Sequence, residues 1–396
     1  MNVLVINCGS SSLKYQVINS DTKEVLAKGL CERIGIDGRL VYQKAGLDKE
    51  ITDLPMPTHT EAVKFVLDAL TNEKTGALKS LEEIDAVGHR IVHGGEKFKS
   101  SVVITDDVIK AVEECNDLAP LHNPANIIGI NACRELMPNV PMVGVFDTAF
   151  HANMPQKAYM YGVPYKYYEN YKVRRYGFHG TSHSFVSKRA AELAGKPYDN
   201  LKTIVCHLGN GASVSAVLNG VSVDTSMGLS PLEGLIMGTR SGDIDPSAIE
   251  FIAKKEGMDL SKAVNMLNKE SGMLGLTEIS SDFRDISAAM EKGDEKAKVA
   301  LDTYCYRVAK YVGAYVAAMN GVDVIAFTAG IGENDDFIRR NVMKYFGYLG
   351  ITIDDSKNDN CHEERKISTD DSKVEVYVIP TNEELAIAED TVALVG

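Results

Sequence analysis

The chain has 396 residues, which exceeds one ordinary hydrophobic core and predicts two domains. Its hydrophobic (44%) and charged (24%) contents are those of a globular protein, and its net charge of −13 argues against nucleic-acid or anionic-membrane partners. No apolar run approaches the roughly 18 residues of a membrane span, and the N-terminus does not resemble a signal peptide. Seven dispersed cysteines without a C-x-x-C pair indicate reduced thiols and a cytoplasmic protein.

Residues 3–19, VLVINCGSSSLKYQVIN, predict an apolar strand, a small polar turn and a returning strand. Residues 204–219, IVCHLGNGASVSAVLN, repeat this order two hundred positions later. Hairpins are common enough for two to look alike by chance. In both, however, a polar residue, Asn7 or His207, ends the first strand and Gly follows two places later. This shared detail favours a duplication.

Each half continues with a short apolar run bounded by glycines, at 84–95 and at 322–334, which predicts buried strands with ligand-side loops at their ends. Helical periodicity is clear at 61–70, 183–195 and 297–320. We therefore expect two related α/β halves, with ligands collecting at strand carboxyl ends in a crevice between them.

The turns within the two hairpins are suited to phosphate. Glycine lets the backbone approach a ligand, and successive N–H groups then face an anion. The first turn adds hydroxyls and the cation Lys14, and the second adds Asn210 and Ser213. Neither stretch is a P-loop, and a strand rather than a helix follows each turn, which excludes a Rossmann fingerprint. Two such turns suit a nucleoside triphosphate, although each alone is also simply a hairpin.

Several longer motifs occur in order along the chain: NCGSSSLKY, GHRIVHGG, LAPLHNPAN, FDTAFH, RRYGFHGTSH, HLGNGAS, MGTRSGDIDP and AGIGEN. Together they resemble the acetate kinase (acetokinase) family, within the actin-like ATPase superfamily. The resemblance implies an α/β fold of two duplicated actin-like (ribonuclease H-like) domains with a nucleotide cleft between them. We place an acyl-substrate-side domain at 1–150 plus 383–396 and a nucleotide-binding domain at 151–382. The resemblance also implies ATP/ADP as co-substrate, Mg²⁺ with Mn²⁺ as a substitute, and a homodimer.

Phosphoryl transfer to a carboxylate brings two anions together, so cations must surround the reacting centre. Arg90 and Arg240 are the candidates, since a guanidinium grips a carboxylate or phosphate with two hydrogen bonds. A lone arginine is more often part of a surface ion pair. Few acidic residues lie near Arg90 in the sequence, which favours function. The resemblance implies that the two arginines bind the carboxylate and stabilise the transition state.

The histidines add a second set of candidates. His179 and His183 are four residues apart, but no third ligand supports a zinc site. We expect a helix beginning near Thr181 or Ser182, with His179 just before it and able to donate to a phosphoryl oxygen. The resemblance implies that His179 stabilises the transition state. His207 is a further phosphate candidate.

His122, which precedes a helix start at Pro124, is also expected to contact phosphate. His89, His93 and His151 suit structural roles.

Asp147 follows an apolar run at a strand end. The resemblance implies a proton donor or acceptor, but acetate is already ionised at neutral pH and needs no base. Orientation of Mg²⁺ or its waters, or simple capping of the following loop, are the alternatives. The resemblance implies Asn7 and Glu383 as metal ligands, whereas Glu383 is also an ordinary acid for a first helical turn.

Two further sets of candidates rest on the resemblance. The nucleotide set comprises Lys14, His207, Leu208, Gly209, Asn210, Gly211, Asp282, Phe283, Arg284, Gly330, Ile331, Gly332, Glu333 and Asn334. Asp282 and Arg284 suit a surface ion pair equally well. The acyl-pocket set comprises Val92, Leu121, Phe178 and Pro231. One added methylene changes discrimination in such a pocket by only about 1–3 kcal/mol, so acetate is favoured but propionate remains acceptable.

The tyrosine-rich stretch 158–177 suits either a surface loop or a dimer contact. The polar stretch 357–373 predicts a solvated loop or hairpin. The function we expect is reversible, direct in-line transfer of the ATP γ-phosphoryl group to acetate. The alternatives are a kinase for propionate or another short-chain acid, a nucleotide-switched interaction protein, and a polyphosphate hydrolase.

Overall fold

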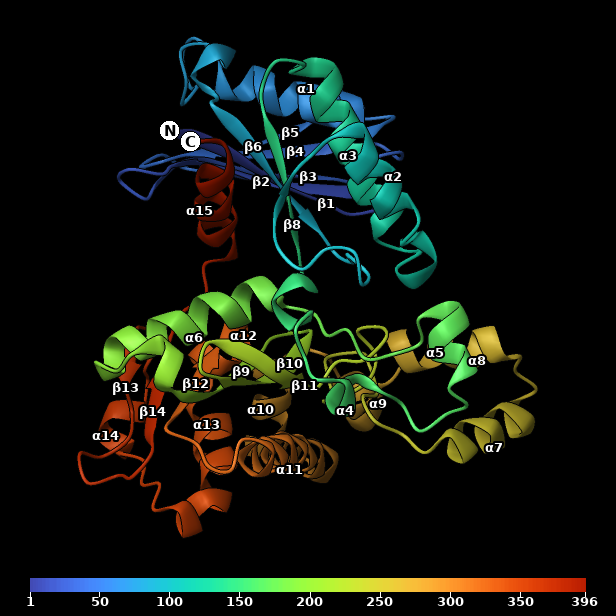
Figure 1. Cartoon of the computed structure of the whole chain (residues 1–396), viewed down its shortest axis with the longest axis vertical. Helices are drawn as coiled ribbons and strands as arrows, with labels where there is room; N and C mark the ends of the chain where they lie inside the picture. The colour runs from blue at the N-terminus through green and yellow to red at the C-terminus, as the bar shows by residue number, and fades with distance from the viewer. The chain divides into compact units, whose positions relative to one another are not determined.

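The chain, in a computed structural model that describes residues 1–396, folds into two units. Unit 1 comprises Met1–Ala152 and Asn382–Gly396, and unit 2 comprises Asn153–Thr381 (Figure 1). No helix combines the length and the apolar composition needed to cross a membrane. All seven cysteines are buried and free, as their dispersed spacing predicted.

Unit 1 contains one sheet in the order β5-β4-β3-β2-β1-β6-β8-β7. Its strands are β1 (Asn2–Cys8), β2 (Ser12–Asn19), β3 (Glu24–Glu32), β4 (Arg39–Lys44), β5 (Glu50–Asp53), β6 (Ala86–Ile91), β7 (Val102–Val103) and β8 (Met142–Phe146). β1 pairs antiparallel with β2 and parallel with β6, and β6 pairs parallel with β8. The predicted first hairpin is therefore confirmed.

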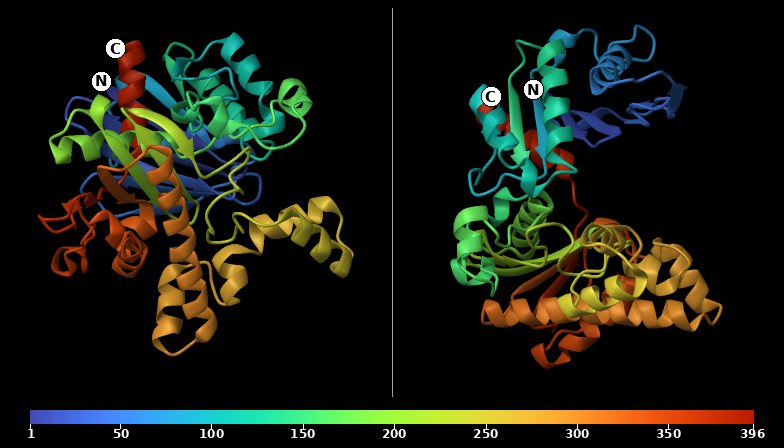
Figure 2. Two further views of the ribbon diagram at one scale, coloured as in Figure 1. Left: turned by 60° about the horizontal axis from the view of Figure 1, so that its bottom comes forward. Right: turned by 90° about the vertical axis from the view of Figure 1, so that its right-hand side faces the viewer.

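Helices cover both faces of this sheet, which explains why β1 is apolar on both sides. Its residues Leu4 and Ile6 pack in the same cluster as α1 and α3, whereas Val3 and Val5 pack with α15. The helices of unit 1 are α1 (His59–Leu70), α2 (Asp106–Glu113), α3 (Asn123–Leu136) and α15 (Glu383–Val395). Both chain ends lie in this unit, with α15 beside the first strands (Figure 2).

Unit 2 contains the sheet β11-β10-β9-β12-β14-β13. Its strands are β9 (Lys202–Leu208), β10 (Ala212–Leu218), β11 (Val221–Thr225), β12 (Val324–Thr328), β13 (Arg365–Lys366) and β14 (Glu375–Val378). β9 pairs antiparallel with β10 and parallel with β12, and β12 pairs parallel with β14. The second predicted hairpin is thereby confirmed.

The helices of unit 2 include α6 (Gly180–Ala194), which packs on β9 and β12, and α11 (Glu295–Ala318), which packs on β9 and β10. The others are α4 (Gln156–Tyr159), α5 (Lys166–Tyr171), α7 (Pro246–Glu256), α8 (Leu260–Lys269), α9 (Gly272–Thr277), α10 (Phe283–Glu291), α12 (Ala329–Asn334), α13 (Asp336–Met343) and α14 (Asp355–Asn358). Helices α1, α6 and α11 confirm the three periodic segments, and each begins two or three residues earlier than expected.

The two sheets share a five-strand core. The order β3-β2-β1-β6-β8 in unit 1 corresponds to β11-β10-β9-β12-β14 in unit 2, with the same parallel and antiparallel pairings at each step. The predicted duplication of an α/β domain is therefore confirmed. The polar stretch 357–373 contains the end of α14 and β13, which forms a hairpin with β14.

Candidate active site

Three neighbouring strands of unit 1 end in polar residues on the face that α15 covers. Side chains alternate along a strand, so Asn7 follows Val3 and Val5 on one face of β1. Arg90 is two residues after Gly88 on β6, so it lies on the same face of the sheet, and Gly88 packs against α15. Asp147 directly follows the end of β8. Helix α15 begins at Glu383. The fold thus collects four predicted site residues at one edge of the sheet.

Arg90 and Asp147 form a two-pronged ion pair. Arg90 Nε donates to Asp147 Oδ1 at 2.9 Å, and Nη2 donates to Oδ2 at 2.7 Å. Asp147 is almost fully buried, and its charge is the main reason why the pKa of Arg90 is raised. The expectation that Arg90 lacks acidic neighbours is wrong. The two residues are 57 positions apart in the chain, and only the adjacent pairing of β6 and β8 brings them together.

Further carboxylates surround this pair. Burial, together with Asp147 and Glu384, raises the pKa of Glu383 despite the opposing charge of Arg90. Lys14, opposite Asn7 in the β1–β2 ladder, forms an ion pair with Glu384. Burial and the two neighbouring carboxylates therefore oppose the ionised form of Glu383, despite the cations nearby.

This charge imbalance fits the implied divalent cation. Asn7 and Glu383 supply an amide oxygen and a carboxylate, the kind of oxygen ligands that Mg²⁺ prefers when it keeps several waters and substrate phosphates. No group of three or more His, Cys, Asp or Glu side chains that could hold a metal occurs in the structure.

Helix α3 holds the loop after β6 in place through two asparagines. Asn123 Oδ1 accepts from the His93 N–H at 3.1 Å, and Asn126 Oδ1 accepts from the Val92 N–H at 3.0 Å. Asn126 Nδ2 also donates to the Cys8 carbonyl at 2.8 Å, at the end of β1. Neither positioning residue was among the predicted candidates, although both lie in the motif HNPAN. The available signal was the pair of asparagines at the start of the predicted helix.

Two histidines of unit 1 differ in position. His122 is the N-cap of α3, as its place before Pro124 predicted. His89 is buried on β6, where burial lowers its pKa to about 3. His89 is therefore neutral at physiological pH, in keeping with a structural role.

The turn of the second hairpin, Gly209–Gly211, organises the candidate residues of unit 2. The Gly238 N–H donates to the Asn210 carbonyl at 3.0 Å, which ties the turn to the segment that carries Arg240. A Cβ at position 238 would lie 1.9 Å from Asn210 Oδ1, so a larger residue there would displace the Asn210 side chain. A Cβ at Gly211 would lie 3.4 Å from Arg240 Nη1 and 3.5 Å from His179 Nε2. Both side chains therefore border the turn.

Arg240 has no carboxylate partner. Its Nη1 contacts only the Pro231 carbonyl at 3.5 Å and the Met237 sulfur at 3.7 Å, and burial lowers its pKa. A guanidinium that is partly removed from water and has no anionic partner is a ready binding group for a phosphate or carboxylate.

His179 is the N-cap of α6 and adopts the left-handed conformation with φ of 56°. The helix therefore begins at Gly180 rather than near Thr181 or Ser182, which corrects our expectation. A left-handed residue other than glycine costs on the order of 1–3 kcal/mol and occurs mainly where surrounding contacts impose it. The His179 ring stacks on His207, with centroids 4.1 Å apart, and its Nδ1 lies 2.9 Å from Ser213 Oγ.

Two further segments of unit 2, 282–284 and 330–334, carry the remaining nucleotide candidates. Asp282 is the N-cap of α10, and hydrogen bonds from Arg284 lower its pKa to about 2. Arg284 is 90% exposed, so the alternative of a surface ion pair describes this structure.

Gly330–Asn334 forms most of helix α12 rather than the expected loop, which is a second correction. The Glu333 carboxylate accepts from the backbone N–H groups of Ala329 and Thr381, at 2.8 and 3.1 Å, and so caps this helix.

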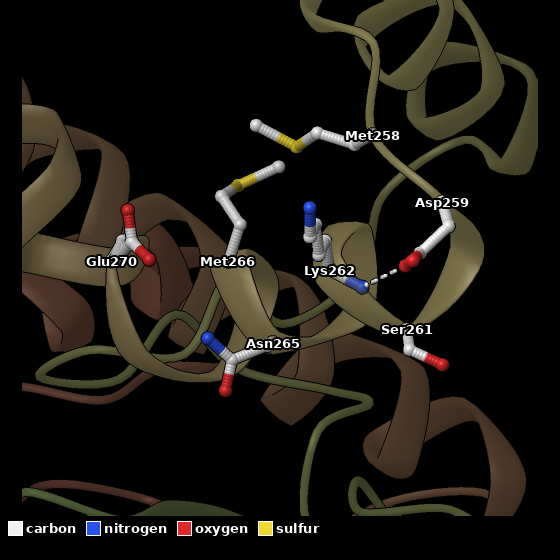
Figure 3. A pocket seen from close by; sticks show the side chains of 7 residues that line it. All are labelled: Met258, Asp259, Ser261, Lys262, Asn265, Met266 and Glu270. Carbon is white, nitrogen blue, oxygen red and sulfur yellow. Dashed lines mark hydrogen bonds between the residues drawn. The ribbon is translucent and has the colours of Figure 1, made fainter.

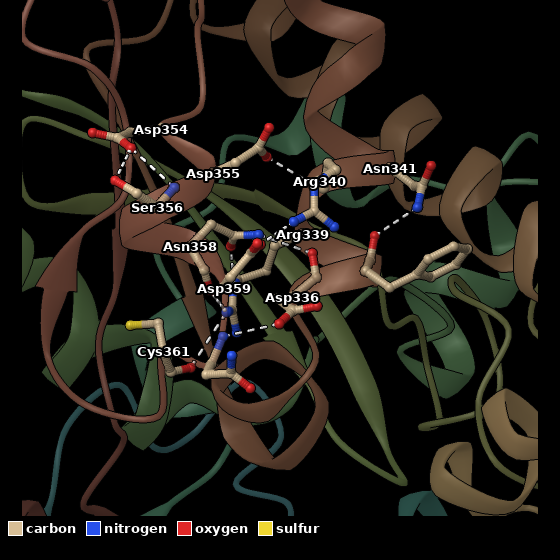
Figure 4. Close-up of polar contacts among 12 residues, drawn as sticks. Asp336, Arg339, Arg340, Asn341, Asp354, Asp355, Ser356, Asn358, Asp359 and Cys361 are labelled. Atoms are coloured by element: carbon tan, nitrogen blue, oxygen red, sulfur yellow. Dashed lines mark hydrogen bonds and ion pairs between the residues drawn. The ribbon is translucent and has the colours of Figure 1, made fainter.

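A fully buried arginine anchors the end of α12 (Figure 4). Arg339 Nη1 donates to the carbonyls of Gly332 and Glu333 at 3.0 and 2.9 Å. Its Nε and Nη2 donate to the side chain and carbonyl of Asn358, each at 2.8 Å. No local pattern signals this role, because Arg339 stands between Ile338 and Arg340 in an ordinary helix pattern.

The four acyl-pocket candidates are divided between the units. Val92 is buried in unit 1, where Leu121 is 73% exposed, and Phe178 is buried in unit 2, which also contains Pro231. A separate surface pocket lies on α8. Figure 3 shows the side chains of Met258, Lys262 and Met266 extending into the same space. None of the predicted site residues lines this pocket.

Comparisons with known proteins cover the whole chain. Residues 2–389 match the model of the acetokinase family. An acetate kinase of Agathobacter rectalis is 73% identical over 397 residues, with 100% of both chains covered. The crystal structure of Porphyromonas gingivalis acetate kinase matches with a TM-score of 0.98 at 49% identity over 100% of both chains. That of a propionate kinase from Francisella tularensis matches with a TM-score of 0.92 at 43% identity over 99% of each. Because the family model and these relatives span essentially the entire sequence, the chain belongs to the acetokinase family.

Proposed function

We propose that this protein is an acetate kinase, which transfers the γ-phosphoryl group of ATP directly to acetate and runs the reverse reaction at the same site. The observation that carries this proposal is the 73% identity, over the full length of both chains, to the acetate kinase of Agathobacter rectalis. The nucleotide-switched protein and the hydrolase are disfavoured because membership of the acetokinase family implies a carboxylate acceptor.

Unit 1 is proposed to bind the acyl substrate through Arg90. Asp147 occupies two of the five guanidinium N–H donors, which leaves three for a carboxylate. Asp147 therefore suits the role of holding the guanidinium in a fixed orientation. A role as base is unnecessary, since acetate is ionised at neutral pH.

Unit 2 is proposed to bind the triphosphate at Gly209–Gly211. Arg240 and His179 border this turn, so both are positioned to offset the charge of the transferring phosphoryl group. His207 and Leu208 lead into the same turn. The segments 282–284 and 330–334 are the proposed contacts for the nucleoside.

The co-substrate is proposed to bind as its magnesium complex. Asn7 and Glu383 would hold the ion, which would neutralise charge on the phosphate oxygens. Lys14 remains available to phosphate only if it leaves Glu384.

A hydroxamate assay with ATP, Mg²⁺ and acetate tests the function, because hydroxylamine traps acetyl phosphate directly. We expect hydroxamate that depends on both acetate and ATP. ATP turnover that ignores added acetate would overturn the proposal.

The propionate kinase relative is the specific reason to test a second acid. Val92 and Leu121 of unit 1 are proposed to contact the methyl group, and such an apolar pocket discriminates one methylene by about 1–3 kcal/mol. We expect kcat/KM for acetate to exceed that for propionate by about tenfold or more. A higher kcat/KM for propionate or butyrate would reassign the substrate.

We further propose a homodimer. The tyrosines of α5 include Tyr167 and Tyr171, which are 38% and 66% exposed, and α7 and α8 expose Phe251, Leu260 and Val264. Large exposed apolar and aromatic side chains are typical of interfaces. Light scattering should give twice the mass of the chain, and a Phe251→Asp, Leu260→Asp double variant should give the single mass if α7 and α8 form the contact. The seven buried free thiols support a cytoplasmic location.

A further inference from the structure

A chain of hydrogen bonds in unit 2 leads from the protein interior to His179. Ser215 Oγ lies 2.8 Å from His183 Nδ1, and His183 Nε2 lies 2.7 Å from Ser213 Oγ. Ser213 Oγ in turn lies 2.9 Å from His179 Nδ1. Ser213, Ser215 and His183 are all fully buried. The chain therefore joins β10 and α6 beneath the Gly209–Gly211 turn.

The donor and acceptor roles along this hydrogen-bond chain can run in only two consistent directions. The reason is that the Ser213 hydroxyl has one proton and contacts two imidazole nitrogens. In the first direction Ser213 donates to His179 Nδ1 and accepts from His183 Nε2, and Ser215 donates to His183 Nδ1. In the second direction every bond is reversed. The two directions give opposite tautomers of His179.

Ser215 decides between the two directions. The hydroxyl of Ser215 has His183 Nδ1 as its sole partner. In the second direction His183 would donate to Ser215, and the buried Ser215 proton would have no acceptor. In the first direction the protons of Ser213, Ser215 and His183 all have acceptors within the hydrogen-bond chain, and buried donors are almost always satisfied.

We propose that Ser213 is a positioning residue, held in direction by His183 and Ser215, that fixes His179 as the tautomer with its proton on Nε2. This proposal rests on the proposed phosphoryl transfer. His179 Nε2 borders the Gly209–Gly211 turn, so this tautomer presents a neutral donor to a phosphoryl oxygen. The opposite tautomer would present a lone pair to an anion.

The stacked ring of His207 has the same arrangement. Thr381 Oγ1 donates to Ser182 Oγ at 2.9 Å, which leaves the Ser182 proton for His207 Nδ1 at 2.8 Å. Two imidazolium rings stacked at 4.1 Å would repel each other, which disfavours a positive charge on both rings at once. Neutral rings still donate one N–H each.

The test is ¹⁵N NMR of the full chain labelled at histidine, because the two ring nitrogens of a neutral imidazole give distinct signals according to which one carries the proton. The His179 signals are assigned by their loss in His179→Gln. We expect His179 to be the Nε2–H tautomer. A wild-type His179 that carries its proton on Nδ1, or on both nitrogens, overturns the proposal.

Two variants test the chain of hydrogen bonds itself. In Ser213→Ala, we expect mixed His179 tautomers and a fall in kcat on the order of tenfold, with both KM values within about twofold of wild type. Ser215→Ala removes the hydroxyl that fixes the donor and acceptor roles, and Ser215 does not border the turn. We therefore expect mixed His179 tautomers in this variant too. Unchanged tautomer and kcat in both variants would contradict the proposal.

Ser187→Ala is the matched control, because it removes a buried hydroxyl of α6 that contacts Tyr198 and lies outside this hydrogen-bond chain. We expect its His179 tautomer and kcat to be those of wild type. The hydroxamate assay on the wild-type enzyme tests the proposed function separately. The NMR spectrum reports the His179 tautomer without any enzymatic turnover, so the two proposals can fail independently.

Discussion

Arg90 and Arg240 show how the surroundings decide what an arginine does. Asp147 raises the pKa of Arg90 and holds its guanidinium with two hydrogen bonds. Burial without a carboxylate lowers the pKa of Arg240. The first arginine is oriented in advance, whereas the second has its charge uncompensated. Both states favour an incoming anion, the first by geometry and the second by charge.

The first prediction concerns Arg240→Met. We expect kcat/KM in the hydroxamate assay to fall by about 10²–10³-fold, because one donor to the transition-state charge is lost. We expect the melting temperature to stay level or rise, since replacing a buried, unpaired charge by an apolar side chain removes a desolvation penalty. Arg189→Met is the control, as Arg189 pairs with Glu192 and Glu364 on the surface. An active Arg240→Met enzyme would refute the role.

The second prediction concerns Glu383→Gln. Burial raises the pKa of Glu383, so the stability that this carboxyl contributes is complete below its unfolded pKa of about 4.3 and is lost as pH rises through the raised folded pKa. Glutamine cannot lose a proton. We therefore expect the variant to melt above wild type at pH 8, with the difference gone near pH 4, and to be inactive.

Melting temperatures recorded across this pH range check the second prediction. Glu389→Gln, in the same helix but exposed and paired with Lys23, should show no such pH trend. A Glu383→Gln protein that is less stable than wild type at pH 8 would contradict the expected direction of the effect.

At the scale of elements, a buried arginine sets the position of a proposed nucleotide helix. Arg339 donates to carbonyls at the end of α12 and to Asn358 of α14, so two short helices share one anchor. Helices of six and four residues have little stability of their own. Their placement depends on such tertiary bonds.

The third prediction compares Arg339→Met with Arg340→Met. The first leaves buried carbonyls unsatisfied, so we expect a loss in the free energy of unfolding on the order of 3 kcal/mol and a KM for ATP that rises more than the KM for acetate. The second removes surface pairs with Asp355 and Asp359 and should cost about 1 kcal/mol or less. Urea unfolding and initial rates measure both effects. Equal losses in the two variants would contradict the anchor.

At the scale of the whole molecule, the chain leaves unit 1 at Ala152 and returns to it at Asn382. Helix α15 then packs on β1, β6 and β8, so unit 1 is complete only with the last residues of the chain. Gly88 makes this packing possible, because a Cβ there would lie 2.6 Å from both Ile387 Cγ2 and Thr391 Oγ1.

The fourth prediction is that Gly88→Ala weakens unit 1 selectively. Overpacking costs about 1–3 kcal/mol, and we expect faster hydrogen exchange in β1, β6, β8 and α15. Exchange in β9, β10 and β12 of unit 2 should not change. Gly162→Ala, where a Cβ meets nothing within 4 Å, is the control. Exchange that rises equally in both units would refute this division.

The local sequence pattern was enough to predict the hairpins, the three periodic helices and the duplication. Alternation and periodicity of apolar residues, and turns of small residues, depend only on a few neighbouring positions. The start of α6 was misplaced because His179 adopts a left-handed N-cap conformation that stacking on His207 and contact with Ser213 support. N-cap propensity alone favours Thr181 or Ser182.

The amino-acid sequence by itself determined the strands, the turns and the types of side chain at each strand end. Only the tertiary structure decided that Asp147 grips Arg90, that Arg240 has no acidic partner, and that Ser213 lies between two histidines. The physical reason is that the contacts of Asp147 and Ser213 join residues 30 to 57 positions apart. Charge, burial and hydrogen-bond direction depend on such neighbours, which strand order and helix packing choose.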